Sequence, residues 1–131
     1  MGDYAAAESH GSIAIGSEAN ATGMQSIALG DEAKGTGYQA TVVGGEATAS
    51  GINSLATGFG AKSSGHFSSS FGSEAVSDGA FATAIGSGAN ASAKSATALG
   101  ESSTANIEGG VALGSDSKTN IGSGVLGYDP S

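Results

Sequence analysis

A glycine that returns every fourteen residues is the feature that most constrains how this chain folds. It is the last residue of a five-residue motif of the form Ser-Ile-Ala-Leu-Gly. Only the last interval, to Gly127, is thirteen residues. We call these residues the phase glycines and expect them to be structural: Gly16, Gly30, Gly44, Gly58, Gly72, Gly86, Gly100 and Gly114. A period this constant indicates one structural unit repeated along the chain.

Large and small side chains alternate around each phase glycine. Alanine fills most of the positions two before and three after it. The position directly before it is bulky in most repeats, and we expect these residues to be structural: Ile15, Leu29, Val43, Phe71, Ile85, Leu99 and Leu113. Such alternation is typical of a β-strand with both faces occupied, and a second short strand is expected downstream. A turn glycine follows it, and we predict a positive φ there, at Gly23, Gly37, Gly51, Gly65 and Gly79.

Two short strands cannot bury a hydrophobic face alone, so the repeats are expected to stack as a parallel solenoid. The lumen is predicted to be narrow, because mostly Ala and Ser face it. Nine turns at about 4.8 Å each would give a rod of roughly 43 Å. The bulky residues would then form an apolar stripe larger than soluble monomers normally expose. We expect another copy of the same chain to cover this stripe.

The pattern S-x-A-x-G-x-x-A-x-A-x-G resembles the head repeat of trimeric autotransporter adhesins, the YadA-like head of Gram-negative bacteria. The resemblance covers about residues 10 to 127. It implies an all-β fold, a left-handed parallel β-roll (solenoid) of about nine 14-residue turns, assembled as a homotrimer about a threefold axis. It also implies a place on the Gram-negative cell surface, tethered by an outer-membrane anchor that this sequence does not contain.

We expect a single head domain over residues 1–131. Residues 1–9 are expected to form an N-terminal cap or partial turn, residues 10–127 the repeats, and residues 128–131 an exit segment. The sequence shows no signal peptide and no apolar run of membrane-spanning length. We therefore expect an excised, soluble head fragment that makes no direct membrane contact.

The resemblance implies attachment to host extracellular-matrix proteins or host-cell receptors, and self-association between bacteria, as in autoagglutination or biofilm. Three identical faces would add many weak contacts into strong attachment. A structural spacer in the adhesin fibre is the alternative. Another solenoid binding protein, for ice or for cations, is a third interpretation.

The charge of the chain bears on its partners, because the formal net charge is −8 at pH 7. Nucleic acid is not expected to bind, because no basic stripe is present to neutralise phosphates. Glu18, Glu32 and Glu46 each lie two residues after a phase glycine and form a candidate acidic ladder for a metal cation. A docking strip for a basic ligand and a solvated acidic edge that keeps the rod soluble are the alternatives for the same column.

Four large side chains in variable positions of the repeat are candidates for ligand contact: Tyr38, His66, Phe67 and Phe81. Phe67 and Phe81 are fourteen residues apart, so we expect them to lie one above the other. The sequence has no cysteine, its two histidines lie four repeats apart, and no serine lies in a G-x-S-x-G elbow. We therefore expect neither enzymatic activity nor a cofactor.

Overall fold

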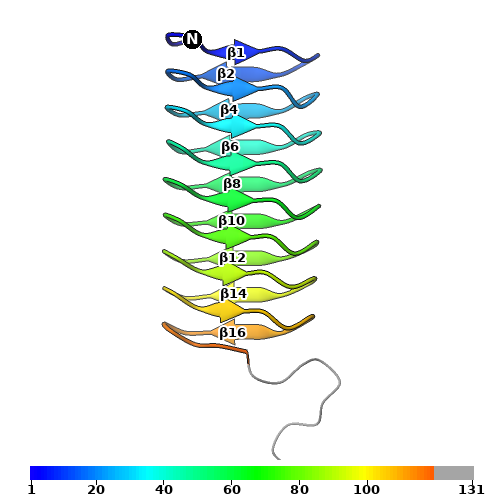
Figure 1. Cartoon of the computed structure of the whole chain (residues 1–131), viewed down its shortest axis with the longest axis vertical. Coiled ribbons are helices and arrows are strands. Elements are labelled where there is room, and N and C mark those ends of the chain that lie inside the picture. Colours follow the sequence, from blue (N-terminus) through cyan, green and yellow to red (C-terminus); the bar gives the residue numbers. More distant parts are fainter. Residues whose placement is uncertain (120–131) are drawn as a thin grey trace, which may run out of the picture.

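The chain coils into a rod of stacked parallel strands (Figure 1). The computed structural model describes residues 1–119, which form sixteen strands in two eight-stranded parallel sheets. These sheets make about eight turns of an all-β parallel solenoid, so the predicted fold class is confirmed at this level. The expected ninth turn, which ends at Gly127, and the exit segment 128–131 lie outside the described residues.

Each turn contributes one strand of two residues and one strand of three. We call the first set the odd sheet: β1 (Ala6–Ala7), β3 (Asn20–Ala21), β5 (Lys34–Gly35), β7 (Thr48–Ala49), β9 (Lys62–Ser63), β11 (Val76–Ser77), β13 (Asn90–Ala91) and β15 (Thr104–Ala105). We call the second set the even sheet: β2 (Ile13–Ile15), β4 (Ile27–Leu29), β6 (Thr41–Val43), β8 (Leu55–Thr57), β10 (Ser69–Phe71), β12 (Thr83–Ile85), β14 (Thr97–Leu99) and β16 (Val111–Leu113).

The register between neighbouring strands equals the sequence period. Ala14 lies opposite Ala28, and Ile15 lies opposite Leu29. The corners continue the same ladder, since the amide of Gly30 donates to the carbonyl of Ile15 at 2.8 Å. The backbone is thus paired around most of each coil, and every column of the aligned repeats becomes a physical stack of side chains.

The core is a narrow lumen between the two sheets, as the small residues predict. Its alanines, such as Ala28 and Ala33, are fully buried, and the largest fully buried side chain is that of Val42. Where serine replaces alanine, most of the hydroxyls find partners: the Oγ of Ser63 lies 3.0 Å from that of Ser68, and the Oγ of Ser70 donates to the carbonyl of Lys62 at 2.7 Å. The buried Oγ of Ser26 is the exception, with no hydrogen-bond partner among the described residues.

The prediction of a positive φ at the turn glycines is wrong. None of the five has one; a positive φ occurs instead at Glu18 (53°) and Gln25 (58°) and at the equivalent residues of the other described turns. The turn glycines are required because a Cβ would collide with the next turn: on Gly37 it would lie 2.1 Å from the carbonyl oxygen of Gly51. The phase glycines from Gly16 to Gly100 meet both constraints: Gly16, for example, has a φ of 133° and no room for a Cβ.

The regular coil includes the N-terminal residues that we expected to form a cap or partial turn. The strand β1 pairs with β3, and Gly2 has the same extended, positive φ as the phase glycines. The amide of Ala6 donates to the carbonyl of Ala19 at 2.8 Å. Among residues 1–119, no helix is long and apolar enough to cross a membrane.

Candidate functional site

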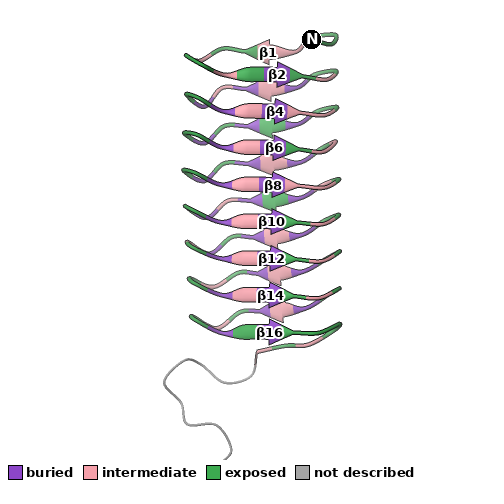
Figure 2. Ribbon diagram, turned by 180° about the vertical axis from the view of Figure 1, so that it is seen from behind, coloured by how far each residue is buried: buried purple, intermediate pink, exposed green. Residues whose placement is uncertain are grey.

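The outer face of the even sheet is uncovered in the single chain: intermediate and exposed residues flank a buried column along it (Figure 2). Its two columns flank the buried alanine column, and neither contains a charged residue. The most exposed large members, at 39 to 69%, are Ile13, Ile15, Val43, Phe71, Ile85, Leu99, Val111 and Leu113. We call this surface the apolar face. It is the stripe that the alternation of side chains predicts.

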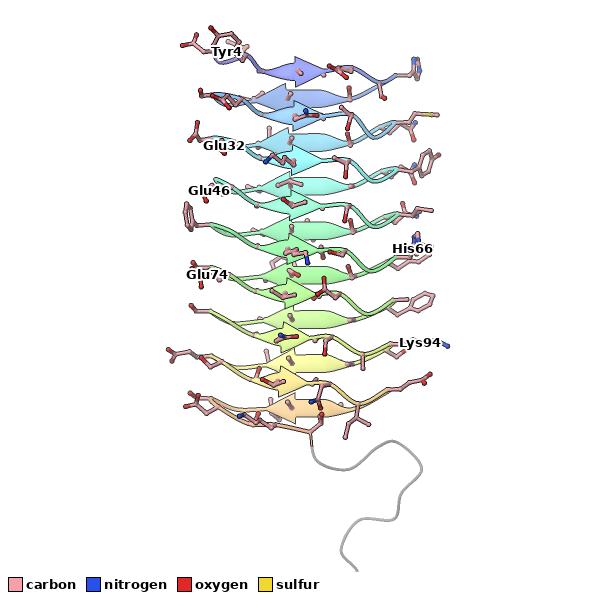
Figure 3. All side chains as sticks on the ribbon, viewed as in Figure 1. Tyr4, Glu32, Glu46, His66, Glu74 and Lys94 are labelled. Carbon is pink, nitrogen blue, oxygen red and sulfur yellow. The ribbon has the colours of Figure 1, made fainter. Side chains whose placement is uncertain are left out.

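One corner of the rod carries a second line of large exposed side chains. This is the turn that leads from the odd sheet into the even sheet, and five consecutive turns each present one such residue there: Met24, Tyr38, Ile52, Phe67 and Phe81. We call these residues, together with His66, the aromatic corner; His66 is labelled on it in Figure 3. All four predicted ligand-contact residues lie on this corner.

Side chains of the aromatic corner contact their equivalents one turn away. The rings of Phe67 and Phe81 stack as predicted, with centroids 5.4 Å apart. The amide Nε2 of Gln39 donates to Oε1 of Gln25 at 2.8 Å. The backbone amide of Ile52 donates to Nδ1 of His66 at 3.3 Å. These contacts restrict the side chains before any partner binds, which lowers the entropy cost of binding.

The opposite corner, which follows the phase glycine, is acidic. Glu32, Glu46 and Glu74 project from it in Figure 3, on the far side of the rod from His66. Its acidic residues are Asp3, Glu18, Asp31, Glu32, Glu46, Glu74, Glu101 and Asp116, eight of the twelve in the sequence. The other four acidic residues balance the four lysines, so this acidic corner accounts for the whole net charge of −8.

The structure brings Glu18, Glu32 and Glu46 into one exposed column but not into a metal-binding cluster. Within residues 1–119, no group of three or more His, Asp or Glu side chains is placed to hold a metal ion. The ion pairs, Lys62 with Asp78 at 3.3 Å and Lys94 with Glu108 at 3.6 Å, lie away from this corner. The geometry therefore favours the solvated acidic edge.

Comparison with protein families identifies the repeat. The family described as the YadA head domain repeat matches residues 7–33, 36–61, 63–89 and 91–117, which is most of the chain. The chain belongs to the YadA head repeat family. The resemblance predicted from the repeated pattern is thereby confirmed. A comparison with curated proteins gives no match.

A solved structure supports the same assignment of this YadA-like head. The crystal structure of the collagen-binding domain of the Yersinia adhesin YadA is similar to it, with a TM-score of 0.62 and 26% sequence identity. The similarity covers 86% of this chain and 74% of that one. The chain is thus an adhesin head of the YadA type.

Sequence reasoning missed two members of the aromatic corner in this YadA-like head. Met24 and Ile52 are 50% and 40% exposed and occupy the same column as Tyr38 and His66. That shared column was the available signal, but only the corner geometry shows that the whole column faces outward. No pocket opens in the described part of the rod, so its exposed features are ridges and faces.

Proposed function

We propose that this YadA-like head is the attachment part of a surface adhesin of a Gram-negative bacterium, tethered by an outer-membrane anchor outside this sequence. It acts as a left-handed β-roll in a homotrimer about a threefold axis, and its mechanism is binding without a chemical step. The apolar face carries this proposal, because a continuous uncharged stripe is more than a soluble monomer normally leaves exposed.

A second copy fits the apolar face better than an unrelated partner. Another solenoid of the same repeat rises by the same distance per turn, so its side chains stay level with those of the first chain along the whole rod. Loss of charged residues is also typical of the centre of a protein interface. Three copies closed about one axis would cover the face of every chain and leave no open end for further addition.

The aromatic corner supports matrix binding. Aromatic side chains are enriched at the centres of protein interfaces, and the similar solved structure is described as a collagen-binding domain. Collagen is therefore the first ligand to test, followed by other matrix proteins and host-cell receptors. Each head would present the corner three times, and many heads on a cell would multiply weak affinities.

Two measurements test this proposal in sequence. Light scattering should give a mass of about 37 kDa, three times the 12.3 kDa of one chain. Immobilised collagen should then retain the trimer, and the variant Tyr38→Ala with Phe67→Ala should bind at least about tenfold more weakly. The matched control Glu32→Gln, on the acidic corner, should bind as the wild type does.

The outcomes separate the two functions. A folded trimer that binds neither matrix proteins nor host cells would favour the structural spacer in the adhesin fibre. A folded monomer would overturn the homotrimer.

A further inference from the structure

Two neighbouring turns of the apolar face differ in the order of their large and small side chains. In β8 the face carries large Leu55 first and small Thr57 second, whereas in β10 it carries small Ser69 first and large Phe71 second. Phe71 is the one aromatic residue on this face within residues 1–119. The order of sizes is therefore reversed between two neighbouring turns.

The strand register sets the neighbours of Phe71 on the face. It lies opposite Thr57 in β8 and Ile85 in β12. Ser69, on the same face of the same strand, lies opposite Leu55 and Thr83. The ring thus stands beside two small hydroxyl residues, and it remains 39% exposed. The large side chain of Phe71 thus lies next to the small side chain of Ser69.

A repetitive face has an inherent problem of register. Every turn resembles the next, so a second copy shifted along the rod by one whole turn would lose little contact. Such shifted pairs do not close on themselves and lead to open, growing assemblies in place of a closed ring. A single non-repeating residue can specify register where a repeating interface leaves it ambiguous.

We propose that Phe71 and Ser69 together set the axial register of the homotrimer. This inference rests on the proposed homotrimer with the apolar face at its axis. A threefold rotation keeps equivalent residues of the three chains at the same height along the axis. The ring of each Phe71 is then level with Ser69 of a neighbouring chain and packs over it. A shift of one turn toward the N-terminus would place that ring against Leu55, a large side chain, and a shift toward the C-terminus would place it against Thr83, which is branched and larger than Ser69.

The test exchanges the positions of the small and the large side chain in β10. The double variant Ser69→Leu with Phe71→Thr copies the arrangement of Leu55 and Thr57 and keeps a large and a small residue in the turn. All these positions face outward, so the coil should still form, as far-UV circular dichroism will show. We expect native mass spectrometry and light scattering to find a mixture of species above the trimer mass, whereas the wild type gives one trimer.

A matched control makes the same exchange elsewhere on the face. The double variant Thr97→Leu with Leu99→Thr leaves Phe71 in place and should give a single trimer. A milder variant, Phe71→Leu, places the residue type of Leu99 at this position. It should give a smaller fraction of species above the trimer mass than the double variant does. It also keeps the test decisive if the exchanged double variant does not fold.

The results distinguish this inference from the function on which it rests. A single trimer of wild-type stability from both Phe71 variants would overturn the register role of Phe71 and leave the homotrimer standing. The same mixture from the control at Thr97 and Leu99 would also overturn it, because any exchange of sizes would then suffice. A monomeric wild type would overturn both inferences.

Discussion

Phe67 and Phe81 stack face to face across one turn of the rod, with ring centroids 5.4 Å apart and ring planes within 2° of parallel. Both residues have a positive φ, of 58° and 60°. A left-handed backbone costs a residue with a side chain roughly 1–2 kcal/mol. The ring contact, like the amide contact between Gln25 and Gln39, offsets part of that cost in a column where glycine would be unstrained.

The stack predicts a stability difference between two exposed phenylalanines. Phe81→Ala should lower the free energy of unfolding by about 1 kcal/mol more than Phe59→Ala, because Phe59 is equally exposed but stacks on no ring among the described residues. Urea unfolding of both variants measures the difference. Equal losses would mean that the stacked geometry adds nothing.

Glycines with and without room for a Cβ are predicted to differ in how much a substitution by alanine destabilises the coil. A Cβ on Gly44 would lie 2.3 Å from the carbonyl oxygen of Gly58, so Gly44→Ala should destabilise the coil by about 4 kcal/mol or more. Gly60 has a φ of 65°, and the nearest atom to its Cβ is 3.6 Å away, so Gly60→Ala should cost only about 1 kcal/mol. Thermal unfolding distinguishes them, and similar melting temperatures would contradict this account.

The narrow lumen predicts intolerance of larger side chains. Ala84 is fully buried between Ser70 and Ala98, and Ala84→Leu should lower the stability by about 3 kcal/mol because the sheets must separate. Ile85→Leu, one residue on and facing outward, should cost less than about 1.5 kcal/mol in the same denaturant titration. A stable Ala84→Leu rod would show that the lumen can widen.

The charge repulsion at the acidic corner predicts that the thermal stability of the rod depends on ionic strength. Like charges on adjacent turns, about 4.8 Å apart, repel by roughly 0.9 kcal/mol in water, and salt screens this repulsion. The melting temperature should therefore rise with sodium chloride, and by the same amount with calcium chloride at equal ionic strength. A larger rise with calcium would instead support the cation ladder of Glu18, Glu32 and Glu46.

The sequence by itself determined the features that repeat. The period, the two strands per turn, the narrow lumen, the apolar face and the stack of Phe67 on Phe81 all follow from columns fourteen residues apart. Parallel stacking turns a distance along the chain into a contact between neighbouring turns. A regular pattern is therefore enough to predict these contacts.

Only the tertiary structure decided what happens at the corners. There the path of one turn is limited by the carbonyl groups of the next, so Gly37 is required for space while Gln25 and Glu18 take the positive φ. The corners also place eight acidic residues on one edge of the rod and a line of large side chains on the other. These features depend on how successive turns approach one another, which the spacing of residues along the chain does not specify.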